Sequence, residues 1–276
     1  MDFRQRNSRG QCNHHSRRCE VNKYVIVIFA LSLDCAASVA LAVDEPNATP
    51  YRPTVSTPAN LSEPGWLELE LGGQRTSGGD PARRDSISYT LKYAFTPDWG
   101  VRVGGDAWVR EVGADGSRWS GFGDTALIVK RRFALNDDAA FGLEGGVNLP
   151  TAKDGLGSRN ADYLVTCIHS ANLGDYHTDL NLSATRLGQI AAGENRWQTA
   201  WAASLSRALG ERWGVAGEFS GTYRKNVPST AQFLTAVAYN YSKRVVFDVG
   251  AAAGLNRASA DWSLFAGVTL LIGKIQ

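Results

Sequence analysis

From Trp66 onward, apolar and polar side chains alternate along the chain with a period of two. Runs of this kind occupy residues 87–95, 101–110, 141–149, 215–224 and 245–254. Because successive side chains of a β-strand point to opposite faces, each run predicts a strand with one apolar and one polar face. The pattern indicates an all-β chain from residue 65 to residue 276.

Short turn signals and longer polar stretches separate the predicted strands. The short turns are expected at 96–98, 136–138, 173–175, 210–212 and 242–244. The longer stretches, which we interpret as loops, lie at 74–85, 111–121, 150–161, 187–195, 225–230 and 256–260. Together they predict about twelve antiparallel strands, with short turns on one side and long loops on the other. This arrangement is typical of a transmembrane up-and-down β-barrel.

A soluble β-sandwich or lipocalin-like barrel is the alternative fold. Aromatic residues favour the membrane, because they gather at strand ends as interfacial girdles do. They are Phe95, Trp99, Phe133, Tyr176, Trp213 and Tyr241 beside turns, and Trp66, Trp197 and Trp262 on the expected loop side. A soluble barrel of this size would enclose a charged lumen and expose its apolar faces to water. The sequence therefore favours a membrane barrel.

Composition excludes several other classes of protein. The chain has 276 residues, of which 43% are hydrophobic and 20% are charged, with a net charge of +2. A disordered chain would be less hydrophobic, and a nucleic-acid-binding domain would show a clear basic excess. The chain also contains no apolar run of 18 residues, so it is not a bundle of membrane-spanning helices. Nucleic acid is not an expected partner, whereas the lipid bilayer is.

The amino-terminal residues resemble a secretory signal peptide. Lys23 precedes an apolar run at 24–33, and the small residues that follow end in an Ala-x-Ala site at Ala42. This order of basic, apolar and small residues predicts cleavage after residue 42. Residues 1–20 are unusual ahead of such a leader, and two interpretations stay open: an extension ahead of an alternative start at Val21, or a long basic n-region of the signal peptide. Residues 43–64 hold five of the nine prolines and predict an extended periplasmic tail.

Removal of residues 1–42 would also remove three of the four cysteines, leaving Cys167. A single cysteine forms no intramolecular disulfide and no cysteine-based metal cluster. We therefore expect neither a metal nor a cofactor.

Four sequence motifs resemble an outer-membrane transporter family known as "MetA-pathway of phenol degradation". They are WLELELG at 66–72, GFGD at 121–124, LPT at 149–151 followed by GLGS at 155–158, and DWSLFAGVT at 261–269. The resemblance extends from about residue 61 to residue 273. It implies a barrel in the outer membrane of a Gram-negative bacterium, inserted by the barrel-assembly machinery, that transports small solutes, some of them aromatic. The chain departs from common barrel sequences by ending on Gln276 rather than on an aromatic residue.

Charged residues on the polar face of the strands form the candidate solute pathway. A charge that faced lipid at the bilayer midplane would cost about 2–4 kcal/mol, which favours an inward position for all of them. The predicted inward residues are Glu68, Glu70, Lys92, Arg102, Asp106, Trp108, Arg110, Asp124, Lys130, Arg132, Glu144, Asp179, Glu218, Arg224 and Asp248.

Two interpretations of this set stay open. In the first, the charges pair with one another and make a closed, structural barrel rigid. In the second, a basic stripe along the second to fourth strands attracts anionic solutes such as aromatic carboxylates. The stripe would contain Lys92, Arg102, Arg110, Lys130 and Arg132, with Trp108 beside it.

A lipid-modifying enzyme is the third interpretation, and the sequence gives it little support. His169 and Ser170 are adjacent, but neighbours in a strand face opposite sides and cannot share a proton. His177 lies across a short turn from His169, so a site with two histidines is conceivable, although a metal would need a third ligand. We expect no catalytic residues and no enzymatic activity.

The strand pattern predicts a topology in which the short turns face the periplasm and the longer loops face outward. An epitope tag inserted at residues 150–161 should be detected on intact cells, whereas a tag at 96–98 or 210–212 should not. Detection of either turn tag at the cell surface would show that the orientation is reversed.

Overall fold

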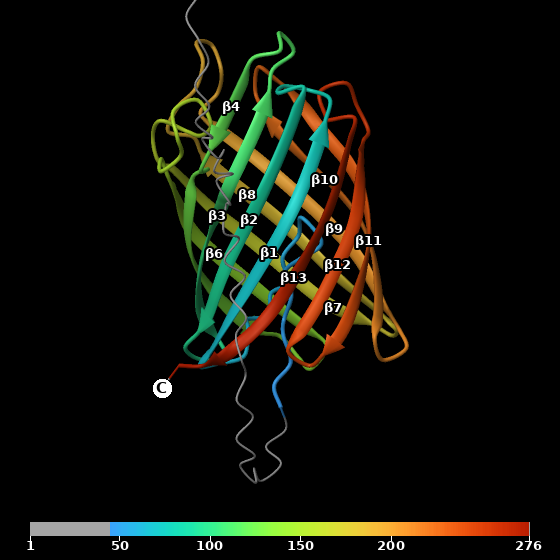
Figure 1. Cartoon of the computed structure of the whole chain (residues 1–276). Coiled ribbons are helices and arrows are strands. Elements are labelled where there is room, and N and C mark those ends of the chain that lie inside the picture. The colour runs from blue at the N-terminus through green and yellow to red at the C-terminus, as the bar shows by residue number, and fades with distance from the viewer. Residues whose placement is uncertain (1–44, 276) are drawn as a thin grey trace, which may run out of the picture. The chain divides into compact units, whose positions relative to one another are not determined.

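The computed structural model describes residues 45–275 and consists of strands that form a single closed sheet (Figure 1). All neighbouring strands are antiparallel, which confirms the predicted fold class. The strands are β1 (Trp66–Ser77), β2 (Arg83–Ala94), β3 (Trp99–Val112), β4 (Arg118–Gly121), β5 (Thr125–Ala134), β6 (Ala139–Leu149), β7 (Asp162–Leu173), β8 (Tyr176–Arg186), β9 (Trp197–Leu209), β10 (Trp213–Arg224), β11 (Val227–Ser242), β12 (Val245–Gly254) and β13 (Trp262–Lys274).

The thirteen strand segments form a barrel of twelve strands, as the sequence predicts, because β4 and β5 together occupy one position in the sheet. β4 pairs with the end of β3 at 109–112, and β5 pairs with the beginning of the same strand at 99–105. The two segments are therefore one barrel strand that is interrupted at residues 122–124. Pairing of β1 with β13 from Trp66 to Ser77 closes the ring.

The two ends of the barrel differ in the lengths of their connections. Connections at one end are tight, such as Gly174–Asp175 between β7 and β8, and we call this the turn side. The other end, the loop side, carries the longer connections at 150–161, 187–196 and 255–261. Strands extend into several stretches expected to be loops, and Lys225–Asn226 is a two-residue turn rather than a loop of six residues. Asn226 has a φ of 67°, which asparagine tolerates at such turns.

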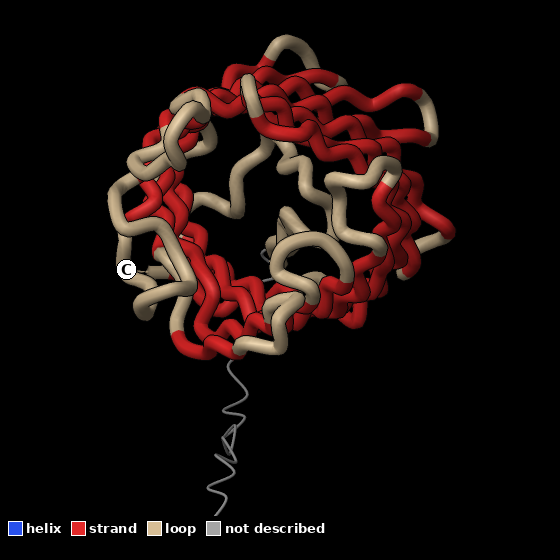
Figure 2. The backbone as a smooth tube through the Cα atoms, turned by 90° about the horizontal axis from the view of Figure 1, so that it is seen from above, coloured by secondary structure: helices blue, strands red, loops and turns tan. Residues whose placement is uncertain are grey.

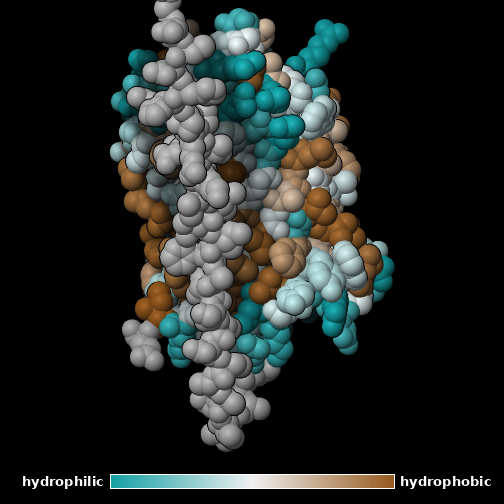
Figure 3. Space-filling view, in the orientation of Figure 1, coloured by the Kyte–Doolittle hydropathy of each residue, from teal (hydrophilic) through white to brown (hydrophobic). Residues whose placement is uncertain are grey.

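The outer face of the barrel is apolar at mid-height, and the inner face is polar. Leu182 is 58% exposed and Val249 is 56% exposed on the outer face, whereas Glu218 on the inner face is fully buried. A band of hydrophobic residues crosses the middle of the barrel in the space-filling view (Figure 3). An exposed apolar belt around a closed barrel is a surface for lipid, because water would oppose it over such an area.

No helix among the described residues is long and apolar enough to cross a membrane.

Exposed aromatic side chains mark the turn-side edge of the apolar band. Trp99, Trp213 and Tyr241 lie there as predicted, and arginine guanidinium groups stack on several of the rings. The Arg131 guanidinium lies 4.9 Å from the centroid of the Trp99 ring. The Arg244 guanidinium lies 4.6 Å from the centroid of the Trp66 ring. Trp66 begins β1 opposite Lys274 and therefore belongs to the turn side, not to the loop side as expected.

A pair of adjacent residues on β8 tests the assignment of the two faces. Leu182→Arg would place a charge against lipid at a cost of about 2–4 kcal/mol, so the folded fraction should fall. Ser183→Arg would place the same charge in a cavity of the lumen, and this variant should fold normally. Heat-modifiable gel mobility measures folding of both variants. Equal folding of the two would contradict the assigned faces of β8.

Candidate functional site

We call residues 45–63 the plug, because the segment enters the barrel at one end and then runs inside it rather than as a free tail outside (Figures 1 and 2). It enters at the turn side, where Ala48 N donates a hydrogen bond to Lys243 O at 2.7 Å. It returns to the same side, where Pro64 forms a bridge with Ala94 at the end of β2. The segment lacks regular strands, as its prolines predict, but its position in the lumen differs from the expected periplasmic tail.

The plug remains in the lumen because carboxylates of the wall accept hydrogen bonds from its backbone. A proline-rich segment cannot pair its N–H groups with one another, so each buried group needs another acceptor. Glu218 accepts hydrogen bonds from Val55 N at 3.1 Å, from Ser56 N at 2.7 Å and from Ser56 Oγ at 2.7 Å. Both Glu218 and Ser56 are fully buried, which strengthens these charge-assisted bonds.

Two further glutamates on β1 bind the beginning of the plug. Thr49 N donates to Glu68 Oε2 at 3.0 Å, and Tyr51 N donates to Glu70 Oε1 at 2.7 Å. Lys92 lies between the two glutamates, with its Nζ 2.5 Å from a carboxylate oxygen of each. The lysine thus compensates part of their charge. The Thr49 amide binds the other oxygen of Glu68, whereas the Tyr51 amide and the lysine share Oε1 of Glu70.

Polar side chains on the opposite wall bind the rest of the segment. The Asn181 side chain accepts from Thr57 N at 2.8 Å and donates to Thr57 O at 2.9 Å. Ser170 Oγ accepts a hydrogen bond from Ala59 N at 2.7 Å. These contacts extend over β7, β8 and β10, so the plug crosses the lumen instead of following one strand.

Two glycines of the wall leave the space that the Arg52 side chain of the plug occupies. Its guanidinium forms a bidentate pair with Asp248, at 3.1 Å from Nε and 3.0 Å from Nη2. A Cβ atom at Gly72 or at Gly267 would overlap this guanidinium, so the wall has space for Arg52 only because both positions lack a side chain. The fit indicates that wall and plug are built for each other.

The Tyr51 ring is the centre of the buried charge cluster. Lys92 Nζ lies 3.9 Å from its centroid and Lys130 Nζ lies 4.1 Å from it, distances at which cation–π attraction is substantial. The phenol donates a hydrogen bond to Asn60 O at 2.9 Å. Burial raises the pKa of Tyr51, so the phenol remains protonated and continues to donate that bond at alkaline pH.

Three members of the predicted basic stripe, Lys92, Arg102 and Lys130, are neutralised by acidic partners. Arg102 Nη2 lies 2.8 Å from Glu144, and Lys130 Nζ lies 3.3 Å from the same carboxylate. With Lys92 between Glu68 and Glu70, three cations thus face three anions. Arg132 binds the plug through Asn60 Oδ1 at 3.0 Å. The structure therefore favours the interpretation of paired lumen charges over that of an open electropositive surface.

Trp108 and Arg110 do not face the lumen, and their predicted inward position is wrong. Asp106 lies opposite Ser88 and Trp108 lies opposite Ile87, so Ala107 is an extra residue at a β-bulge. The extra residue shifts the alternation by one, and Val109 becomes the fully buried inward residue. Arg110, opposite Asp85, consequently lies on the outer face.

The other predicted inward residues form local contacts nearer to the loop side. Arg84 pairs with Asp106 at 2.7 Å and also with Glu111. Asp124 accepts hydrogen bonds from Ala152 N at 3.0 Å and Ser158 N at 2.7 Å, and thereby holds the 150–161 loop. Arg224 pairs with Glu194 at 3.2 Å. These residues lie away from the plug and stabilise the loop-side rim.

The histidines do not form a catalytic or metal site. His169 pairs with the outward residue Leu180, whereas Ser170 faces the plug, as expected for neighbours in a strand. His177 contacts Asp179 at 3.2 Å on the inner face, so the conceivable site with two histidines is not formed. The described residues contain no group of three or more metal-binding side chains.

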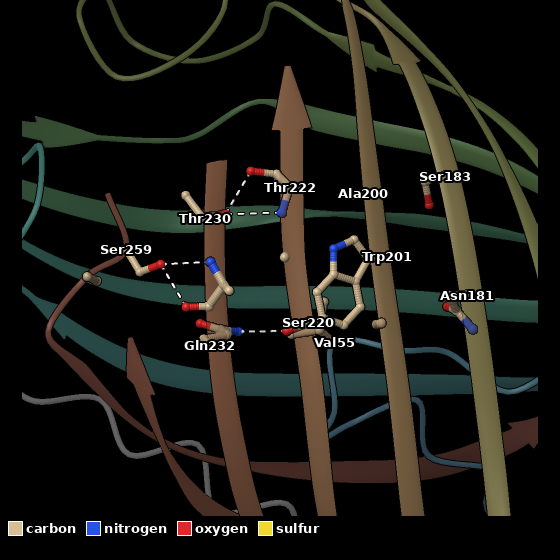
Figure 4. Close-up of a pocket in the computed structure, with 14 residues that line it drawn as sticks. Val55, Asn181, Ser183, Ala200, Trp201, Ser220, Thr222, Thr230, Gln232 and Ser259 are labelled. Carbon is tan, nitrogen blue, oxygen red and sulfur yellow. Dashed lines mark hydrogen bonds between the residues drawn. The ribbon is translucent and has the colours of Figure 1, made fainter. Parts of the chain in front are cut away.

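Cavities remain on both sides of the plug. On the loop side, a cavity of about 330 Å³ lies between Val55, Asn181 and Gln232 (Figure 4). A second cavity, of about 470 Å³, lies along Arg84, Arg102 and Asn148. On the turn side, a cavity of about 370 Å³ separates Tyr51 and Arg52 from the wall at His177. The lumen is thus interrupted by the plug rather than filled by side chains of the wall.

Comparisons with solved structures agree with this fold, although no family model and no curated protein matches the chain. An outer membrane channel from Pseudomonas putida F1 aligns with a TM-score of 0.64 at 12% identity, over 78% of this chain and 98% of that one. The NanC porin aligns with a TM-score of 0.56 at 9% identity, over 74% of this chain and 100% of the porin. The KdgM porin aligns with a TM-score of 0.53 at 12% identity, over 75% of this chain and 99% of the porin. The chain therefore has the fold of outer-membrane channel barrels.

The buried contacts predict that the plug is released as one unit. Glu218→Ala removes the acceptor of three hydrogen bonds, at a cost of about 1.5–3 kcal/mol. Ala59→Cys, in a Cys167→Ser background, should be protected from maleimide and should react about tenfold faster when Glu218→Ala is added.

Val55→Cys is the matched control, because Val55 is 54% exposed to the loop-side cavity. It should react readily with or without Glu218→Ala. Unchanged protection of Ala59→Cys in the Glu218→Ala variant would mean that Glu218 does not retain the plug.

Proposed function

We propose that this chain is an outer-membrane channel for small solutes, and that the plug closes its pathway at rest. The observation that carries the proposal is the polar segment across the lumen with cavities on both sides of it. The closed ring with an apolar outer belt supports the location in an outer membrane. The fold shared with channel and porin barrels supports transport as the activity.

The chemistry of the plug contacts supports displacement rather than a permanent core. The interface is made of hydrogen bonds and ion pairs, such as those of Glu218, Asn181 and Asp248, which water can replace when the segment moves. The cluster of buried apolar residues that includes the plug is small, with Ala59 against Ala140 and Ile168. This cluster opposes release with little hydrophobic free energy.

The resemblance to the phenol-degradation family supports small aromatic or anionic solutes. In the 470 Å³ cavity, Arg84 and Arg102 lie beside the apolar side chains Ile128 and Leu156, which would suit a ring with an acidic group. Asp106 and Asp124 line the same cavity. Because charge in the pathway is balanced, we expect weak selectivity among simple inorganic ions, so that a preference for aromatic anions depends on the shape and the apolar side chains of this cavity.

A closed structural barrel is the second candidate function. It is favoured by the complete pairing of Lys92, Lys130 and Arg102 with glutamates, since buried ion pairs make a wall rigid. An enzymatic function has no such support in the described residues. We further propose that residues 1–42, which lie outside the described residues, are a cleaved signal peptide and that the barrel-assembly machinery inserts the mature chain.

Conductance in planar bilayers discriminates between a channel and a closed barrel. Deletion of residues 45–60 removes most of the plug but keeps Leu61 and Ser62 against the wall, and conductance should increase several-fold over that of the intact chain. Val55→Ala, which alters the exposed tip of the plug, should conduct like the intact chain.

Gel mobility and melting temperature must show that the deletion variant is folded. A folded deletion variant that stays silent would contradict the channel and favour the closed barrel. Liposome swelling with benzoate, compared with a neutral sugar of similar size, then tests the proposed solute class. Equal rates for the two solutes would contradict a preference for aromatic anions.

A further inference from the structure

Three arginines and a single carboxylate share the outer face of neighbouring strands, close to the loop side. Arg75 on β1 and Asp85 on β2 are cross-strand partners, and Arg110 on β3 lies on the other side of Asp85. Arg83 lies two residues from Asp85 and shares its face. We call these four residues the arginine cluster.

Asp85 is almost completely covered, whereas the arginines remain accessible. Asp85 is 9% exposed, and the Arg75 and Arg83 side chains are 55% and 39% exposed. Arg75 Nε lies 2.6 Å from Asp85 Oδ1, and Arg83 Nε lies 3.2 Å from Asp85 Oδ2. Each of these guanidinium groups contacts the carboxylate through Nε, so its terminal amino groups remain available for another acceptor.

The charges of the arginine cluster do not balance. Asp85 is the single carboxylate at the outward positions of β1, β2 and β3, where it contacts Arg75 and Arg83 and has Arg110 as its cross-strand neighbour. The excess of two positive charges matches a phosphate monoester, which carries about −1.5 to −2 at neutral pH. Arginine is the side chain best suited to such a group, because its terminal amino groups form two parallel hydrogen bonds to the oxygens.

The surroundings of the cluster identify a lipid as the bearer of the phosphate. Immediately toward mid-barrel lie Ile87, 49% exposed, and Trp108, 39% exposed, which face each other across β2 and β3. An exposed tryptophan below a group of cations is the arrangement expected at the boundary between acyl chains and headgroups. The β-bulge at Ala107 creates this arrangement, because it turns both Trp108 and Arg110 toward lipid.

Arginines at the turn side are arranged differently. Arg131, Arg207 and Arg244 lie singly over the rings of Trp99, Tyr176 and Trp66. Arg207 and Arg244 each have an acidic partner of their own, Asp175 and Glu45. None of these sites gathers several guanidinium groups, so they serve as matched controls for the cluster.

We propose that the arginine cluster binds the phosphate of a phosphorylated lipid in the outer leaflet, with the acyl chains against Ile87 and Trp108. The proposal rests on the membrane position in the proposed function and on the predicted orientation with the loop side outward, but not on conductance. Lipopolysaccharide, whose lipid A part carries phosphate monoesters, is the phosphorylated lipid of that leaflet. Binding would fix β1 to β3 against lipid at the strands that also hold Glu68, Glu70 and Lys92.

Binding is measured by native mass spectrometry of the full mature barrel in neutral detergent, with diphosphorylated lipid A as the probe. We expect the intact protein to bind this lipid and to bind dephosphorylated lipid A at least about tenfold more weakly, since the charged contacts are lost. Inorganic phosphate should not compete at equal concentration. Effective competition by inorganic phosphate, or equal binding of the dephosphorylated lipid, would overturn the proposal.

The variant Arg75→Gln/Arg83→Gln/Asp85→Asn removes the cluster without leaving a buried carboxylate unpaired. It should bind lipid A about tenfold more weakly. Arg110→Gln leaves the Arg75–Asp85–Arg83 contacts in place, should fold normally, and should weaken binding about threefold. The control Arg131→Gln/Arg207→Gln should bind as the intact protein does.

Binding unchanged in both cluster variants, or lost equally in the turn-side control, would overturn the site. If the triple variant does not fold, Arg110→Gln decides the question alone. A silent channel in planar bilayers would contradict the proposed function without affecting these binding results. Loss of binding in the cluster variants with normal conductance would separate the two roles.

Discussion

Every backbone group in a bilayer needs a hydrogen-bond partner within the protein, and this constraint determines the architecture of the chain. The pairing of β1 with β13 meets it, because without that pairing two strand edges would face lipid. Closure then separates an outer face, where apolar residues such as Leu182 and Val249 meet lipid, from an inner face that collects the charges. The plug, the cavities and the arginine cluster all depend on this separation.

Inside the ring, a second requirement decides what the plug can be. Glu68, Glu70, Glu144 and Glu218 are buried, and unpaired buried carboxylates would be very costly. Lysines and an arginine of the wall neutralise some of them, while backbone amides of the plug satisfy Glu68, Glu70 and Glu218. The plug and the wall therefore stabilise each other: the segment supplies donors that the wall lacks, and the wall supplies acceptors that a proline-rich segment cannot provide for itself.

A single extra residue, Ala107, links the inner and the outer surface. On the turn side of the bulge, Arg102 and Asp106 face the lumen, and on the loop side Trp108 and Arg110 face lipid. The same strand thus contributes a charge to the pathway at one end and to the arginine cluster at the other. The bulge shifts by one residue which side chains of β3 face inward, so the polar positions before it face the lumen and those after it face lipid.

The sequence by itself determined the barrel, the strand number, the turns and most of the inward charges, because a period of two is a local property of the chain. It also indicated that residues 43–64 are extended. Only the tertiary structure decided the position of that segment, since it depends on acceptors such as Glu218 and Asp248, far along the chain. Likewise, the faces of Trp108 and Arg110 depend on pairing with β2, which no local pattern in 101–110 reveals. The alternation of apolar and polar residues depends only on sequence neighbours and can be read from the sequence. Bulges and lumen contacts depend on residues far apart in the sequence and form only when the chain folds.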